Sequence, residues 1–205
     1  MPRPSNTDER RAQIVDGLQA VMATHGYEGA TIAAIAKACD LTPGLVHYHF
    51  ETKQQILLAL IEKLAGLWRA RAVHESSPGD SARERLGKLV DAWLGLDARA
   101  DAAAMACWVT LSGEALRQPA VRELYVAALR EAKAVVEHAV REVLDGERRV
   151  ASEAAAIAAA LMAAMQGYLQ LGVLAGGLVP RASAARTLRA MAYGAIEAQP
   201  KAGKR

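Results

Sequence analysis

The sequence has few cysteines and few aromatic residues. Two cysteines in 205 residues are too few for a disulfide scaffold, and no metal-ligand spacing occurs around them. Aromatic residues make up 4% of the chain, whereas hydrophobic residues, many of them alanine, make up 52%. This composition favours helices that pack closely through small side chains, and only a few β-branched runs argue for strands. We therefore expect an all-α fold without a metal or cofactor.

Signatures of catalysis and of export are also missing. The sequence contains no GxSxG, HExxH or phosphate-binding loop. On a helix, His47 and His49 point about 200° apart, so they do not share a metal ion. The N-terminal stretch has no apolar segment typical of a secretory signal. We expect a cytoplasmic protein that is not an enzyme.

Positive charge is not concentrated at the N-terminal end. The formal net charge is +3, but residues 1–75 contain eight basic and eight acidic side chains. A broad basic patch is therefore not expected there, and any DNA affinity must come from a few placed groups. The candidates are the helix N-termini and the basic residues Arg3, Arg10, Arg11, Lys37 and Lys53.

Residues 31–50 predict two short helices joined by a tight turn. Thr31 is placed to cap the first helix, and Asp40 stands where the turn needs a positive φ. Thr42 is placed as the N-cap of the second helix, with Pro43 at its first position, where the missing N–H costs nothing. The pattern is that of a helix-turn-helix unit.

The second of these helices carries an unusual exposed face. Val46 and Phe50 point toward the first helix, while the opposite side presents Gly44 and Tyr48, flanked by Leu45 and His47. Solubility explains such a face poorly, whereas insertion into a DNA groove explains it well, because the helix N-terminus attracts phosphate and the side chains reach base edges.

Capping boxes and apolar periodicity predict further helices. Thr52-x-x-Gln55 opens a long helix with Lys53 at its first position, and Ser81-x-x-Glu84 opens another after a linker at residues 75–80. A break is expected at residues 98–101. Tyr27 is interpreted either as a core residue of the three-helix unit or as a phosphate ligand.

Residues 154–180 contain no charged residue. Such a window is long enough to cross a membrane, but it is dominated by Ala and Gly, includes two glutamines, and lacks flanking aromatic belts. We interpret it as a buried helix that, with the last helix, forms an isologous dimer seam. The predicted seam residues are Ile157, Leu161, Met165, Leu169, Met191 and Tyr193.

Residues 10–58 resemble the DNA-binding domain of the TetR family of bacterial transcriptional regulators. The resemblance rests on residues 26–31 (GYEGAT), Ile35-Ala36, residues 42–46 (TPGLV), Tyr48-His49-Phe50 and Lys53. Asp40 replaces the glycine usual in the turn, and His47 replaces a usual tyrosine. The resemblance implies a DNA-binding domain at 1–52, a helical regulatory and dimerisation domain at 53–199, and a tail at 200–205 that we expect to be disordered.

The resemblance also implies a function for each part. The expected DNA contacts are Thr31, Thr42, Pro43, Gly44, Leu45, His47, Tyr48 and Lys53. Members of this family act mostly as homodimeric repressors on palindromic double-stranded DNA, and they bind a small-molecule effector in the second domain. The candidate effector contacts are Trp93, Met105, Cys107, Trp108, Leu111, Tyr125, Met162, Gln166 and Tyr168. Residues 105–119 further resemble the choline/betaine regulators of the family, which suggests a cation held on Trp108 or Trp93.

Two other interpretations remain open. Cys39 or Cys107 would serve a thiol redox sensor, although a buried, inert cysteine explains each of them as well. A helical module that binds a protein partner fits the composition but leaves the face at residues 42–48 unexplained.

Overall fold

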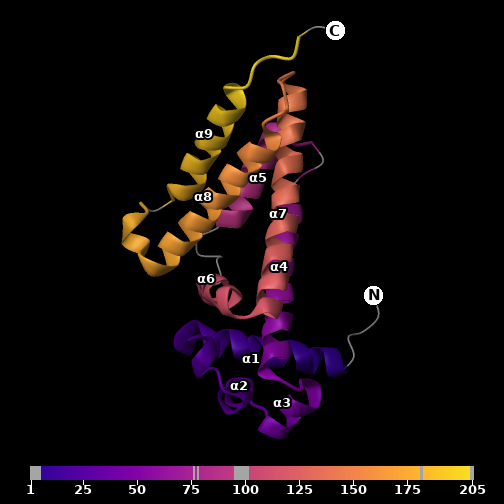
Figure 1. The fold of residues 1–205 in the computed structure, drawn as a ribbon, viewed down its shortest axis with the longest axis vertical. Helices are drawn as coiled ribbons and strands as arrows, with labels where there is room; N and C mark the ends of the chain where they lie inside the picture. The colour runs from indigo at the N-terminus through magenta and orange to yellow at the C-terminus, as the bar shows by residue number, and fades with distance from the viewer. Residues whose placement is uncertain (1–5, 76, 78, 95–101, 181, 204–205) are drawn as a thin grey trace. The chain divides into compact units, whose positions relative to one another are not determined.

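The computed structural model describes residues 6–75, 77, 79–94, 102–180 and 182–203. Over these residues the regular secondary structure is helical, which confirms the predicted all-α fold. The predicted break at residues 98–101 lies outside the described residues. The helices, labelled in Figure 1, are α1 (Asn6–Gly29), α2 (Ile32–Ala38), α3 (Pro43–His49), α4 (Lys53–Glu75), α5 (Ala82–Leu94), α6 (Ala102–Arg117), α7 (Pro119–Gly146), α8 (Ala154–Leu174), the 3-10 turn η1 (Gly176–Leu178) and α9 (Ala184–Glu197).

The chain divides into two compact units. Unit 1 comprises residues 1–66 and 101–128, and unit 2 comprises residues 67–100 and 129–205. The division runs through α4 and α7, so each of these helices contributes one part to each unit. The boundary predicted between residues 52 and 53 separates a DNA-binding part from a regulatory part, which is a division by function and not by packing. It stays a prediction.

Unit 1 is organised around α1, which packs against α2, α3 and α6. Its buried side chains include Ile14 and Leu18 of α1, Ile35 of α2 and Phe50 after α3. At Gly17 a Cβ atom would lie 3.0 Å from the Ile35 carbonyl oxygen, so the glycine lets α2 approach α1 closely.

The regular part of α1 ends at Gly26. This residue has φ 67° and ψ 177°, a conformation that only glycine adopts without strain. The chain then makes one more helical turn to Gly29. The reorientation places Tyr27 and Ala30 in the core of unit 1, where both side chains are buried.

Unit 2 has a core built from α5, the C-terminal part of α7, α8 and α9. The helices α5, α8 and α9 pack on one another and lie side by side in Figure 1. One side of α5 is apolar and faces this core, where Leu86, Leu89, Val90, Trp93 and Leu94 are all buried. The predicted capping box is also present: Glu84 accepts from the Ser81 backbone N–H at 2.8 Å, and Ser81 Oγ accepts from the Glu84 N–H at 3.2 Å.

Charged side chains tie the ends of three helices of unit 2 together. Arg83 at the start of α5 bonds to Glu147 at 2.7 Å and to Glu197 at 2.9 Å. Arg149 also bonds to Glu147, at 3.0 Å. The Arg83 guanidinium and then that of Arg149 hold the pKa of the Glu147 carboxyl below its usual value. These contacts fix the end of α7 against α5 and α9.

The chain end is more ordered than predicted. A tail disordered from residue 200 was expected, yet the Val150 N–H donates to the Pro200 carbonyl at 2.9 Å and the Ala202 N–H donates to Arg148 at 2.7 Å. The prediction is wrong for these residues because their partners lie about fifty positions earlier in the chain, where sequence patterns give no signal. Residues 204–205 lie outside the described part.

Candidate functional site

The helix-turn-helix geometry of unit 1 matches the sequence prediction closely. The Thr31 side chain accepts a hydrogen bond from the Ala34 N–H at 3.1 Å, and Thr42 accepts one from the Leu45 N–H at 3.3 Å. Asp40 has φ 53°, the left-handed conformation expected of the turn. Pro43 is the first residue of α3. Both caps and the turn are thus encoded locally.

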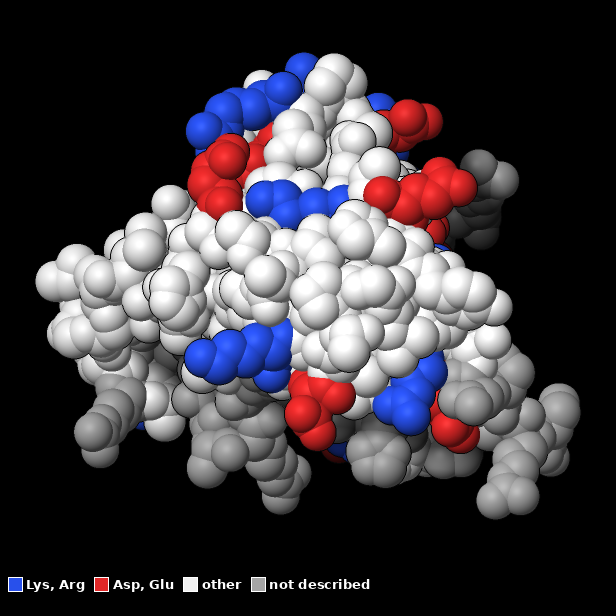
Figure 2. Space-filling model, turned by 90° about the horizontal axis from the view of Figure 1, so that it is seen from below, with Lys and Arg blue, Asp and Glu red and all other residues white. Residues whose placement is uncertain are grey.

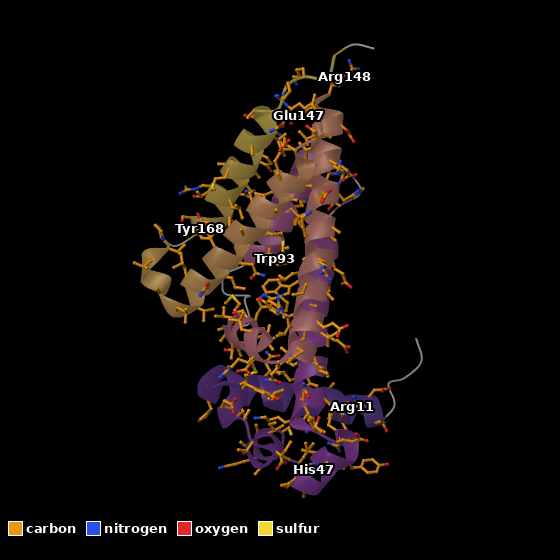
Figure 3. All side chains as sticks on the ribbon, viewed as in Figure 1. Arg11, His47, Trp93, Glu147, Arg148 and Tyr168 are labelled. Atoms are coloured by element: carbon orange, nitrogen blue, oxygen red, sulfur yellow. The ribbon has the colours of Figure 1, made fainter. Side chains whose placement is uncertain are left out.

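One side of α3 is buried and the other faces solvent. Val46 and Phe50 are 0% and 1% exposed, whereas Tyr48 is 80% exposed. The other predicted DNA contacts on this helix are also exposed, apart from Leu45, which is half-buried: they are Thr42, Pro43, Gly44 and His47. Thr31 is exposed as well. In Figure 3, His47 lies on α3 at the bottom of the view.

Lys53 is engaged inside unit 1. Its ammonium donates to the Tyr27 carbonyl at 2.9 Å and lies 4.1 Å from the centroid of the Tyr27 ring. Tyr27 is buried, which agrees with its interpretation as a core residue, and burial, followed by the charge of Glu114, raises the pKa of its phenol. A lysine ammonium has three donors, so a contact of Lys53 with phosphate stays a prediction.

Among the residues that the structure describes, the face that carries α3 has no continuous basic patch. Figure 2 shows Lys and Arg side chains scattered among uncharged ones on this face, with Asp and Glu side chains beside them. An open groove with a cavity volume of about 460 Å³ lies next to the C-terminal end of α3. Its lining includes Arg11 but also Glu51 and Glu62, so it does not favour phosphate. Arg3 lies outside the described residues.

Two residues of α1 that hold this site were not identified from the sequence. Arg11 donates to the His49 carbonyl at the end of α3, and Gln13 donates to the Cys39 carbonyl before the turn at 2.6 Å. Arg11 had been considered only as a basic group for DNA. Both contacts join positions at least 26 residues apart, so no local pattern reveals them.

The candidate effector residues fall into both units. In unit 1, Trp108 and Tyr125 meet with ring centroids 4.8 Å apart, and burial raises the pKa of the Tyr125 phenol to about 12. Cys107 and Leu111 are fully buried beside them on α6, while Met105 is half-buried. Cys107 donates to the Gln19 carbonyl of α1 at 3.3 Å.

In unit 2, the main aromatic feature is a stacked tryptophan pair. Trp93 of α5 and Trp68 of α4 have ring centroids 5.5 Å apart and an interplanar angle of 19°. Trp68 was not among the predicted residues. The indole N–H of Trp93 is buried and has no acceptor within the described part of the chain. Met162 is buried on α8, and Gln166 and Tyr168 are half-buried there; Figure 3 labels Trp93 and Tyr168.

The predicted dimer seam needs correction. Ile157, Leu161, Met165 and Leu169 are at most 7% exposed and belong to the chain's own core, so they do not form a surface between two copies. Tyr193 donates to the Arg83 carbonyl at 2.9 Å and packs under the Arg83 guanidinium, so its side chain also makes contacts within its own chain.

Met191 alone of the predicted seam residues is well exposed, at 55%. The sequence did not separate the two sides of α8 because this helix is apolar all round.

The surface of α8 carries no charged side chain. The helix is long and apolar enough to cross a membrane, yet only 33% of its most apolar window is buried. Alanines and leucines occupy most of the exposed side, and Gln170 is the polar residue on it; the apolar ones include Ala159, Ala160, Ala163, Leu171 and Leu174. On α9, Ala190, Met191 and Gly194 are exposed. Among the residues that the structure describes, no cluster of three His, Cys, Asp or Glu side chains forms a metal site.

Comparison with known proteins identifies both parts of the chain. Residues 14–60 match the family described as "Bacterial regulatory proteins, tetR family", and residues 82–196 match "BetI-type transcriptional repressor, C-terminal". The chain is 31% identical over 162 residues to the HTH-type transcriptional regulator BetI of Rhizobium meliloti, covering 77% of this chain and 78% of that protein. It is 30% identical over 178 residues to BetI of Burkholderia thailandensis, covering 86% and 88%.

Solved structures share the fold. A transcriptional regulator from Rhodococcus sp. Rha1 has a TM-score of 0.80 at 21% identity, covering 94% of this chain and 99% of that one. A regulator from Saccharomonospora viridis, solved in complex with choline, has a TM-score of 0.77 at 24% identity, covering 93% and 96%.

The proteins matched are transcriptional regulators, and regulators of this kind bind DNA, dimerise and bind small-molecule effectors. The chain belongs to the TetR family of bacterial transcriptional regulators, and its C-terminal part is of the BetI type.

Proposed function

We propose that this chain is a cytoplasmic repressor that binds a palindromic operator as a homodimer and leaves it when a small cation binds. Residues 1–52 act as the DNA-binding domain and residues 53–199 as the regulatory and dimerisation domain. The observation that carries the proposal is the exposed face of α3, whose tyrosine, histidine and glycine have no role in the core of unit 1.

In this proposal α3 lies in the major groove. His47 and Tyr48 contact base or sugar-phosphate groups, and Gly44 allows the helix to approach the DNA closely. The N-termini of α2 and α3, capped by Thr31 and Thr42, direct their backbone N–H groups at phosphates. The remaining contacts come from Pro43, Leu45 and Lys53.

The dimer seam is proposed to be the exposed side of α8 and α9. Small residues there, such as Ala159, Ala163 and Gly194, let two helices approach closely, and Met191 and Leu174 supply apolar area. Covering this side with a second copy removes the apolar surface of α8 from water. A dimer seam also explains why α8 is apolar without placing the helix in a membrane.

The effector is proposed to be a small quaternary ammonium compound. A neighbour in fold was solved with choline, and each unit of this chain carries an aromatic pair, Trp68–Trp93 or Trp108–Tyr125. Aromatic faces attract quaternary ammonium groups. The buried N–H of Trp93, which has no acceptor among the described residues, would suit a ligand with a hydroxyl oxygen. Met105, Cys107, Leu111, Met162, Gln166 and Tyr168 complete the candidate set.

Selection of bound sequences from random duplex DNA tests the DNA-binding part. We expect one palindromic site, occupied by two chains, whose affinity falls steeply between low and high salt. No enriched sequence at either salt concentration would overturn the proposal and favour a helical module that binds a protein partner.

Release from the selected site tests the effector class. Choline is compared with 3,3-dimethylbutanol, its uncharged isostere, by displacement of labelled operator DNA. Choline is expected to release the DNA and the neutral isostere is not, since only the cation is attracted by an aromatic face. Equal action of both compounds, or of neither, would contradict a quaternary ammonium effector while leaving the DNA-binding result intact.

A further inference from the structure

We propose that Arg11 and Gln13 of α1 are positioning residues that hold α3 in place and thereby set the affinity for specific DNA. The inference rests on the proposed insertion of α3 into the major groove. It assigns to Arg11 a role other than that of a simple phosphate contact, which is what its charge alone suggests.

Arg11 holds the C-terminal end of α3. One of its guanidinium nitrogens donates to the carbonyl of His49, the last residue of the helix. The last carbonyls of a helix have no partner within the helix, and a cation there also offsets the negative end of the helix dipole. The guanidinium lies 3.9 Å from the centroid of the Phe50 ring, which is itself buried. Arg11 therefore contacts both the end of α3 and the residue that follows it.

Gln13 holds the turn that precedes α3. Its amide nitrogen donates to the Cys39 carbonyl at 2.6 Å, and its amide oxygen accepts from Arg10 at 2.7 Å. The second bond orients the amide so that its nitrogen faces Cys39. This carbonyl immediately precedes Asp40, whose φ of 53° directs the chain into α3. Gln13 thus fixes the point from which α3 departs.

Because α3 is short, these two contacts matter more for its orientation than they would for a longer helix. The helix α3 has seven residues, and Val46 is its one buried side chain. A helix so short is not stable alone, so its direction depends on how its ends are held. Arg11 and Gln13 are two residues apart on α1 and secure both ends of the segment from Cys39 to Phe50. Base contacts have strict distance limits, so a small rotation of α3 forfeits them while leaving phosphate attraction largely unchanged.

The experiment compares Arg11→Met and Gln13→Leu with a matched control, Arg122→Met. Arg122 is an exposed arginine of α7 in the same unit, so the control removes an equal charge. Amide hydrogen exchange of residues 44–50 is measured in the protein without DNA. Affinity is measured for the selected operator and for a scrambled duplex of equal length, each across a range of salt concentrations.

We expect both variants to exchange faster over residues 44–50 while the amides of unit 2 stay protected. The ratio of operator to scrambled affinity should fall about tenfold or more, as expected for the loss of one good base contact. The scrambled duplex should bind with its salt dependence nearly unchanged. Arg11→Lys, which keeps a donor and a cation, should recover most of the ratio, and Arg122→Met should change none of these quantities.

A phosphate contact would give a different result. In that case Arg11→Met weakens binding to both duplexes equally, lowers the salt slope by about 1 per chain, and leaves exchange over residues 44–50 unchanged. That outcome, or unchanged exchange in Gln13→Leu, overturns the inference. Failure of the proposed function is distinguishable, because the wild-type protein would then not prefer the operator over the scrambled duplex at all.

Discussion

The helices α3 and α8 bury their residues in opposite ways. The seven residues of α3 include one buried side chain, and its outer side carries a tyrosine that is 80% exposed. The 21 residues of α8 include seven buried side chains, and its outer side is mostly alanine and leucine, with Gln170 as its polar residue. Both outer sides are unusual for a surface, one because it is aromatic and polar without ion pairs, the other because it is apolar.

The contrast separates two kinds of surface. An exposed side chain of α3 contributes nothing to the core of unit 1, so it is available for contact with DNA. An exposed apolar side chain of α8 has a chemical character that suits burial, so it indicates a surface that another chain covers. Stability and function should accordingly respond to substitution in opposite ways in the two helices.

The largest expected effect is on the buried side of α8. Met165→Ala removes a fully buried side chain from the core of unit 2 and should lower the free energy of unfolding by about 2–5 kcal/mol. Urea unfolding followed by circular dichroism measures it. Leu116→Ala, at an 86% exposed position of α6 outside the proposed dimer seam, is the control and should change the free energy of unfolding by less than about 0.5 kcal/mol. Equal losses would contradict the burial of Met165.

The matching substitution in α3 should affect binding alone. Tyr48→Ala is expected to weaken operator binding by about 1–3 kcal/mol, the value of one good base contact. The midpoint of thermal unfolding should not move, because the side chain is exposed. Fluorescence anisotropy with the selected duplex measures the first quantity and calorimetry the second. Unchanged affinity would mean that this face of α3 does not meet DNA.

The stability of the protein at alkaline pH tests the burial of Tyr125 in unit 1. Burial raises the pKa of Tyr125 to about 12, so between pH 10 and 12 this phenol ionises in the unfolded chain but not in the folded one. Its contribution to stability is complete below pH 10 and is lost as pH rises through 12. Tyr125→Phe should reduce this alkaline loss by about 2 kcal/mol. Tyr48→Phe is the control, and an identical loss in both variants would contradict the burial of Tyr125.

The smallest effect is expected at the ion pairs that join α5, α7 and α9. Arg83 and then Arg149 lower the pKa of Glu147, so its contribution to stability is present above the ordinary glutamate pKa and is lost as pH falls through the lowered value. Glu147→Gln should therefore reduce stability at pH 7 by about 0.2–1 kcal/mol, since the group is partly exposed, and the difference should shrink in acid. Glu123→Gln, at an exposed site of α7, is the control in urea unfolding at both pH values. A difference independent of pH would argue against the ion pairs.

Much of the DNA-binding unit was predictable from the sequence because its signals are local. A cap acts over three residues, and the positive φ of Asp40 follows from the position of one residue between two short helices. The capping box at Ser81 and Glu84 was predictable for the same reason. In each case the partners are near neighbours in the chain, so spacing alone specifies the contact.

The sequence by itself determined the all-α class, the helix-turn-helix caps and the exposed face of α3. Only the tertiary structure decided which side of α8 is interior and that Tyr193 bonds to the Arg83 carbonyl. It also decided that residues 200–202 pair with residues 148–150 after α7, and that Arg11 and Gln13 bond to the carbonyls at the two ends of the segment around α3. The physical reasons are the long sequence separation of these contacts and the similar apolar character of all sides of α8. Contacts between distant residues leave no local pattern, and a helix that is apolar on every side can be turned either way until its neighbours are known.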